Sequence, residues 1–198
     1  FQKDRTLSGF ASLTIRPISQ LRINLGARYT SVRKSAHRSN LFGTSANGVR
    51  STFQPLPLST QTVLAGVVGA DLFDFPDPRR SDDRFMPSVG IQYDVGRNLM
   101  AYATYSTGFK AGGYNSNSFA LSFGPEKVKA YEIGIKGQFL DRRLTVAADI
   151  FRSDYTDLQE TSLIFLPSGL TASLVANAAS SRSQGIEGNL SFALTPQV

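Results

Sequence analysis

Apolar and polar residues alternate with a period of two along several segments of this chain. Residues 20–33 carry Leu21, Ile23, Leu25, Ala27 and Tyr29 on one face, and Arg22, Asn24, Gly26, Arg28 and Thr30 on the other. The pattern returns at residues 126–139 and in a segment that ends near Leu194. Successive side chains of a strand point to opposite faces, so each segment predicts a two-faced strand. An apolar face toward lipid and a polar face toward a wet lumen are typical of a transmembrane β-barrel.

Seven strands are predicted. Their approximate ranges are 4–16, 20–33, a third strand with Val89, Ile91, Tyr93 and Val95, then 99–110, 126–139, a sixth from Arg143 and a seventh ending near Leu194. Alternation becomes unclear after Ile150. Short turns are expected at 17–19, 96–98 and 141–142, and longer loops at 34–81, 111–124 and around 167–169. In an outer-membrane barrel the short turns would be periplasmic and the long loops extracellular.

Turn lengths test the predicted faces, because cross-strand partners must point to the same face. A three-residue turn at 17–19 would place Ile15 opposite Leu21 and Leu13 opposite Ile23. The turn at 96–98 would place Tyr93 opposite Ala101. The turn at 141–142 would place Phe139 opposite Leu144 and Ile133 opposite Ile150. All these pairs join residues that the alternation already assigns to the apolar face.

A soluble β-sandwich is the alternative architecture, in which the apolar faces would form a core. Strands of about thirteen residues argue against it, because strands of soluble proteins usually have about 5–6. The chain is 41% hydrophobic and has no run of about twenty apolar residues, so no transmembrane helix is predicted. Its net charge of +6 is spread without a basic run of five or more, so no nucleic-acid partner is expected.

Enzyme chemistry is not expected. The chain has no cysteine and one histidine, His37, which excludes zinc sites of the usual Cys/His type. No G-x-S-x-G segment is present to hold a serine nucleophile. The carboxylates of the long loop are interleaved with Arg79, Arg80 and Arg84, so charge neutralisation is favoured over a calcium site. These carboxylates are Asp71, Asp74, Asp77, Asp82 and Asp83. Neither a metal nor another cofactor is expected.

Five segments, in this order, resemble the β-barrel domain of TonB-dependent outer-membrane receptors. They are Gly26-Ala27-Arg28-Tyr29-Thr30, the Gly-Phe-Lys-x-Gly-Gly segment at 108–113 with Tyr114-Asn115, Pro125-Glu126 with Tyr131-Glu132-Ile133-Gly134-Ile135-Lys136, Asp154-Tyr155-Thr156-Asp157-Leu158-Gln159, and Asn177-Ala178 with Gly185-Ile186-Glu187-Gly188. Each is weak alone, and their order and spacing carry the resemblance.

The resemblance implies an all-β fold in which residues 1–198 form about seven antiparallel strands of a barrel of about 22. Such receptors also have a plug domain, a TonB-contact segment (the TonB box) and C-terminal strands, which we expect to lie outside this chain. The implied function is active transport of a scarce nutrient, such as a ferric siderophore, across a Gram-negative outer membrane. The implied partners are outer-membrane lipid, TonB and a small-molecule iron chelate. A passive porin or structural barrel remains the alternative function.

Charged residues on the polar faces should lie in the lumen, because a basic side chain at the bilayer midplane costs about 2–4 kcal/mol. Arg22, Glu132, Lys136 and Glu187 are predicted to brace the wall there or to contact a plug. Arg28, Lys110 and Asn115 are candidates for substrate binding. We expect Tyr29, Tyr105 and Phe109 near the outer rim, and Tyr93 and Phe139 near the inner one. The apolar run at 62–69 is predicted to be a loop hairpin or a ligand-facing patch.

Overall fold

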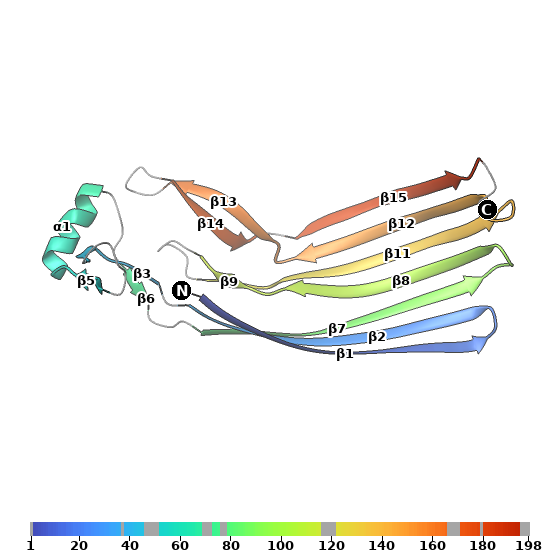
Figure 1. Ribbon diagram of the computed structural model, residues 1–198, viewed down its shortest axis with the longest axis horizontal. Helices are drawn as coiled ribbons and strands as arrows, with labels where there is room; N and C mark the ends of the chain where they lie inside the picture. Colours follow the sequence, from blue (N-terminus) through green and yellow to red (C-terminus); the bar gives the residue numbers. More distant parts are fainter. Residues whose placement is uncertain are drawn as a thin grey trace.

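The computed structural model describes residues 2–36, 38–45, 52–68, 73–75, 79–115, 122–165, 171–178 and 180–194. Its main element is one antiparallel sheet whose seven strands are ordered as they occur in the chain (Figure 1). These strands are β1 (Gln2–Ile18), β2 (Leu21–Ala36), β7 (Arg79–Asp94), β8 (Leu99–Lys110), β11 (Glu126–Phe139), β12 (Leu144–Thr156) and β15 (Ser181–Phe192). The seven predicted strands are therefore confirmed.

Smaller elements gather at the end of the sheet opposite the short turns (Figure 1). They comprise the pairs β3 (Arg38–Asn40) with β6 (Phe73–Phe75), β4 (Gly43–Thr44) with β5 (Gln54–Pro55), β9 (Gly113–Tyr114) with β10 (Ser122–Phe123) and β13 (Gln159–Phe165) with β14 (Thr171–Asn177), and the helix α1 (Leu58–Val68). The hairpin predicted for the apolar run at 62–69 is wrong, since residues 62–68 lie in α1. The alternative, a ligand-facing patch, stays a prediction. No helix in the described ranges is long and apolar enough to cross a membrane.

The sheet is a single layer with no packed core. Only Val32, Ala36, Ala65 and Tyr102 are buried hydrophobic residues in the described part of the chain. Large apolar side chains on the sheet are instead exposed, among them Leu7, Ile133, Ile150 and Ile186. A β-sandwich would cover these side chains with a second sheet, so that alternative is wrong for this chain.

Two of the three predicted turn registers are confirmed. Tyr93 lies opposite Ala101, and Phe139 lies opposite Leu144. The first register is wrong, because Ile15 lies opposite Ile23 and not opposite Leu21. An irregularity between Ile15 and Ile18 lets the strand run through the predicted turn to a tighter one at residues 19–20. The observed register of β1 on β2 differs from the predicted one by two residues, so every side chain keeps its predicted face.

The exposed apolar side chains of the outer face, called here the apolar belt, end at different rows on different strands. The row of Tyr93 continues through Ala101 and Ile135 to Ala148 on β12. Beside β7 the belt ends at Val95, two residues past Tyr93, whereas on β12 it ends at Leu144, four residues past Ala148. A belt that is offset between strands in this way is expected when strands are tilted, and the strands of transmembrane barrels tilt by about 35–45°.

Candidate functional site

The polar face of the sheet, called here the inner face, collects the charged residues predicted for the lumen. The register links Arg22 through Gln92, Tyr102 and Gly134 to Asp149 and then to Glu187. Glu132 and Lys136 flank Gly134 at two-residue spacing, and Arg28 lies on the face of Arg22. The predicted set therefore occupies one face across six strands.

Two groups of contacts brace the inner face toward the short turns. Arg22 Nη2 lies 2.7 Å from Asp94 Oδ1, and the same nitrogen lies 3.7 Å from Met100 Sδ. On the neighbouring strands the Tyr102 hydroxyl donates to Glu132 at 2.5 Å, and the Lys136 ammonium lies 4.8 Å from the centre of the Tyr102 ring. These contacts connect β2, β7, β8 and β11 side by side.

Arg28 lies on the inner face nearer to the loops and is exposed. Its Nε donates to the Thr30 hydroxyl at 3.3 Å and its Nη2 donates to the Ser8 hydroxyl at 3.2 Å. Ser8 and Thr30 also share a hydrogen bond of 3.0 Å. No carboxylate in the described part of the chain pairs with Arg28, so its charge is held in place and remains available to the solvent side.

Glu187 is exposed and lies opposite Asp149 in the register of β12 and β15. Like charges that face each other across two strands destabilise the pair unless a cation lies between them. The ranges described in the structure contain no group of three or more carboxylate or histidine side chains that could hold a metal ion.

Three amide side chains join the loop segments next to the sheet. Asn115 Nδ2 donates to the Val175 carbonyl at 2.8 Å, and the Val175 N–H donates to Asn115 Oδ1 at 2.7 Å. Gln159 Nε2 donates to the carbonyls of Ala111 and Gly124 at 3.0 and 2.9 Å. Asn177 accepts from the Gly124 N–H and donates to the carbonyls of Gly124 and Asp157. We call Asn115, Gln159 and Asn177 the amide latches, since they fasten Ala111, Asn115 and Gly124 to β13 and β14.

Asp82 connects β7 to the same loop segment. It is buried, forms a two-point ion pair with Arg80 at 2.7 Å and accepts from the Gly112 N–H at 2.9 Å. Its hydrogen bond raises the pKa of Arg80. Burial raises the pKa of the neighbouring Tyr114 phenol. The neutralisation predicted for the arginines and carboxylates of this region is confirmed for Arg80 and Asp82. Asp71, Asp77 and His37 lie outside the described residues, as does the loop tip at 167–169.

The glycines of the Gly-Phe-Lys-x-Gly-Gly segment serve close packing. A Cβ on Gly112 would lie 2.3 Å from the Phe123 carbonyl oxygen and 2.6 Å from the Arg80 guanidinium carbon. A Cβ on Gly113 would lie 2.7 Å from the Phe123 ring. Lys110 is exposed and opposite Glu126, and its carbonyl accepts from Gln159 at 3.4 Å. Of the candidate substrate contacts, Lys110 and Arg28 are exposed, whereas Asn115 is buried with its amide held by Val175.

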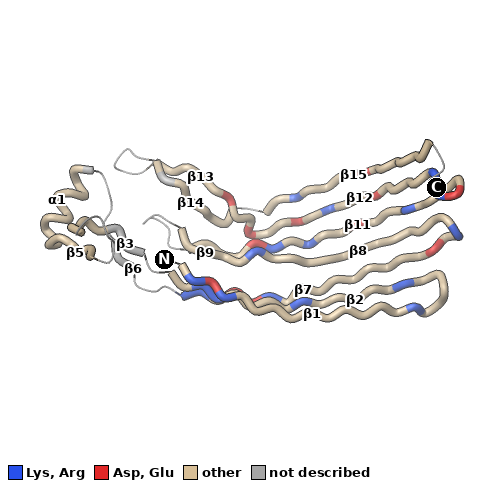
Figure 2. The backbone as a smooth tube through the Cα atoms, viewed as in Figure 1, with Lys and Arg blue, Asp and Glu red and all other residues tan. Residues whose placement is uncertain are grey.

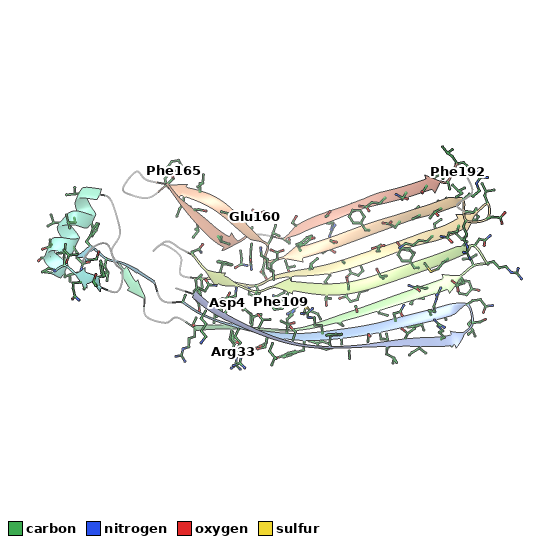
Figure 3. The ribbon with its side chains drawn as sticks, viewed as in Figure 1. Asp4, Arg33, Phe109, Glu160, Phe165 and Phe192 are labelled. Atoms are coloured by element: carbon green, nitrogen blue, oxygen red, sulfur yellow. The ribbon has the colours of Figure 1, made fainter. Side chains whose placement is uncertain are left out.

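Aromatic side chains border the apolar belt on the outer face. Tyr29 lies opposite Phe85, and the rings of Tyr105 and Tyr131 lie 5.1 Å apart. Near the short turns the bordering rings are Tyr93, Phe139 and Phe192, the last of which is labelled in Figure 3. Phe109 shares the face of Tyr105 but lies four residues closer to the loops, opposite Lys127. Two aromatic rows at the edges of an apolar band are typical of a membrane-spanning barrel wall.

The sequence profile of the family described as TonB dependent receptor-like, beta-barrel, matches residues 1–196. This chain belongs to that family. Its members are outer-membrane β-barrels of Gram-negative bacteria, so the sheet is part of an outer-membrane barrel. In such a barrel we expect the inner face to meet the lumen and the outer face to meet lipid.

Two relatives illustrate the likeness in sequence. The ferripyoverdine receptor of Pseudomonas aeruginosa is 29% identical over 121 residues, which are 59% of this chain and 15% of that receptor. The probable TonB-dependent receptor BfrD of Bordetella pertussis is 31% identical over 125 residues, which are 60% of this chain and 16% of that protein. This chain therefore spans about a sixth of the length of the curated relatives it matches.

A solved structure shows the same fold. The ferric yersiniabactin uptake receptor FyuA from Yersinia pestis superposes with a TM-score of 0.69 at 20% identity, over 98% of this chain and 25% of that one. Its identity is low, so the likeness concerns the fold.

Sequence reasoning missed most of the partners of the site residues. Tyr102 and Asp94 lie on the predicted polar faces, and their alternation was the available signal. Asn177 and Gln159 were within segments that resemble the family, but nothing in the sequence indicated the backbone groups they bind.

Proposed function

We propose that the protein containing this chain is a TonB-dependent receptor that actively imports a scarce nutrient, such as a ferric siderophore. The family match over residues 1–196 carries this proposal, and the relatedness to a ferripyoverdine receptor supports the choice of nutrient. In this proposal residues 1–198 form about a third of the wall of a barrel of about 22 strands. A plug domain, a TonB-contact segment and further strands lie elsewhere in the protein. Transport involves no covalent chemistry.

The wall contributes a polar, water-filled path and a fixed outer rim in this mechanism. Arg28 is exposed on the inner face and is oriented by Ser8 and Thr30, so it presents a cation to an anionic chelate or to a plug carboxylate. Lys110 offers a second exposed cation where β8 meets its loop. Asn115 acts differently, since its two hydrogen bonds hold β14. We propose that it supports the loops that contact the ligand.

Dependence on TonB distinguishes this proposal from a passive porin. A strain that lacks the gene is compared with its complemented parent for uptake of ⁵⁵Fe-loaded chelates under iron limitation. We expect one chelate to be imported only with the gene, and only when TonB is intact. Uptake that continues at the same rate without TonB would support the porin alternative.

Ligand contact by Arg28 and Lys110 is tested in the full-length receptor with the chelate that the deletion strain fails to import. Arg28→Gln and Lys110→Ala are expected to leave receptor abundance unchanged and to weaken chelate binding about tenfold each, as loss of one charge-assisted contact predicts. Lys129→Ala is the matched control, since Lys129 is an exposed cation on the outer face. Unchanged binding and uptake in both variants would exclude a transport role for these cations.

A further inference from the structure

Four basic residues of three adjacent strands share the outer face where the sheet approaches the loops. Figure 2 shows Lys and Arg positions gathered at this end of β1, β2 and β7. They are Lys3 and Arg5 of β1, Arg33 of β2 and Arg79 of β7, and we call them the basic collar. Arg5 lies opposite Arg33, and Ser35 lies between Lys3 and Arg79 in the next row. All four are exposed. Figure 3 labels Arg33 at this end of the sheet.

The register fixes the face and the height of the basic collar. Pairing between β1 and β2 is regular from Gln2 to Ile15, so Lys3 and Arg5 share the face of Leu7 and Leu13. Leu7 is the last apolar side chain of this strand on the outer face, and it is 70% exposed. Arg5 lies two residues nearer the loop end of β1 than Leu7. This distance is about 7 Å along the strand, or about 5 Å along the membrane normal at a tilt near 45°. The layer of polar headgroups outside the hydrocarbon core has a similar depth.

The collar is not neutralised, unlike the basic residues on the other face of the same strands. On the inner face Lys34 pairs with Asp4 at 3.8 Å and Arg80 pairs with Asp82. None of the described carboxylates lies within ion-pair distance of a collar side chain. Asp83, one row closer to the membrane on the outer face, accepts a hydrogen bond from Ser81 at 3.3 Å. The collar therefore keeps a net positive charge toward the outside of the barrel.

Two hollows lie among these side chains. One of about 420 Å³ is lined by all four collar residues and by Ser35 and Ser81, with Lys34 and Arg80 completing its wall. A smaller one of about 140 Å³ is bounded by Arg5, Arg33, Leu7 and Ser31. The second hollow leads from the collar to the first apolar row. A ligand that fills both hollows would place an anionic part in the larger one and an apolar part beside Leu7 in the smaller one.

We propose that the basic collar binds the phosphate-bearing headgroup of a lipid in the leaflet next to the loops. Guanidinium groups form two-point hydrogen bonds with phosphate, and the Ser35 hydroxyl can donate a further one. The acyl chains would descend over Leu7 and the apolar belt, while long basic side chains adjust their height to the headgroup. This site faces away from the lumen and is independent of the transported nutrient.

The test uses the full-length receptor in nanodiscs, with bisphosphorylated lipid A as the probe and phosphatidylcholine as the reference lipid. Bound lipid is counted by native mass spectrometry over a titration. Wild type is expected to retain lipid A and to release phosphatidylcholine. Arg5→Gln with Arg33→Gln is expected to weaken lipid A binding about 30-fold, since each basic residue near an anionic surface contributes about a factor of five.

Three further variants keep the test decisive. Arg5→Lys with Arg33→Lys preserves charge and is expected to bind more tightly than the glutamine pair. Lys3→Gln with Arg79→Gln removes the other two cations if the first pair does not fold, as judged by heat-dependent gel mobility. Arg16→Gln with Arg97→Gln removes the same charge near the short turns and should leave binding unchanged. Lipid A affinity within about threefold of wild type in both collar pairs would overturn the proposal, as would equal retention of phosphatidylcholine.

Discussion

At the scale of single residues, the loop end of the sheet depends on side chains that form hydrogen bonds with the backbone of irregular segments. Buried N–H and C=O groups need partners, and loops cannot provide all of them from their own backbone. Asparagine and glutamine suit this task because one amide both donates and accepts. Asn115 uses both functions toward Val175, in the manner of a neighbouring strand.

An isosteric change therefore separates structure from ligand binding at position 115. Asn115→Asp keeps the acceptor for the Val175 N–H and removes the donor for its carbonyl. We expect faster hydrogen–deuterium exchange in β13 and β14, consistent with the loss of about 1–3 kcal/mol for an unpaired buried group. Asn98→Asp in an exposed short turn is the control. Unchanged exchange together with lost chelate binding would instead make Asn115 a ligand contact.

Gly112 is sensitive for a steric reason. A Cβ there would lie under 3.0 Å from both the Phe123 carbonyl oxygen and the Arg80 guanidinium, so Gly112→Ala must disturb the β9–β10 pair and the Arg80–Asp82 ion pair. We expect a loss of about 1–3 kcal/mol in local stability, the usual effect of overpacking. Limited proteolysis of the folded receptor measures it. Gly66→Ala in α1 has no atom within 4 Å of the new Cβ and should resist the protease as well as wild type does.

At the scale of elements, the alternation predicted all seven strands and the faces of their side chains. The first turn was misplaced because an irregularity near Pro17 has no signal in a period-two pattern. α1 was missed because its polar residues come first and its apolar, valine-rich residues follow, so no apolar face with helical periodicity stands out. The latches were not predictable, since their partners are backbone groups up to 60 residues away.

The unclear alternation after Ile150 has a physical cause. Arg152, opposite Tyr131 in the aromatic row, and Asp154, one row nearer the loops, point outward, while Phe151 points inward. Polar outward residues are expected where the wall leaves the hydrocarbon core. Asp154 accepts from Arg182 Nε at 2.7 Å and from Arg152 Nε at 2.9 Å. These hydrogen bonds, first the one from Arg182, hold the pKa of Asp154 below its ordinary value of 3.8.

The sign of this pKa shift predicts a dependence on acid. A lowered folded pKa means that the contribution of Asp154 to stability is complete above pH 3.8 and is lost as the pH falls through the lower folded value. An NMR titration of the Asp154 carboxyl should therefore give a pKa below 3.8. Arg182→Ser should return the pKa toward 3.8, and Arg16→Ser should not. Identical titrations in wild type and Arg182→Ser would exclude this ion pair in solution.

At the scale of the whole molecule, the sheet has two different faces and also two different ends. Its short turns lie at one end, and all the smaller elements lie at the other (Figure 1). Phe165 at the tip of β13 is 84% exposed, as expected for a segment that projects beyond the wall (Figure 3). Function in such barrels is concentrated at the end that carries the long connections.

This polarity predicts which segments a protease can reach. In intact cells that express the full-length receptor, added protease should cut between residues 34 and 81 and spare the turns near residues 19 and 141. Cells with a permeabilised outer membrane serve as the control, because they also expose the periplasmic turns. Cleavage at those turns in intact cells, with 34–81 protected, would invert the topology.

The central claim is that one face of this sheet meets lipid and the other meets water. These 198 residues contain no cysteine. In a full-length receptor from which any cysteine elsewhere has been removed, a single cysteine is placed at each position from 130 to 137 of β11 and spin-labelled. Electron paramagnetic resonance then compares collisions with oxygen, which dissolves in lipid, and with a water-soluble nickel chelate. Labels at 131, 133 and 135 should favour oxygen, and labels at 132, 134 and 136 should favour nickel, with a period of two. Equal accessibility at odd and even positions, or nickel access at 133 and 135, would contradict the transmembrane wall.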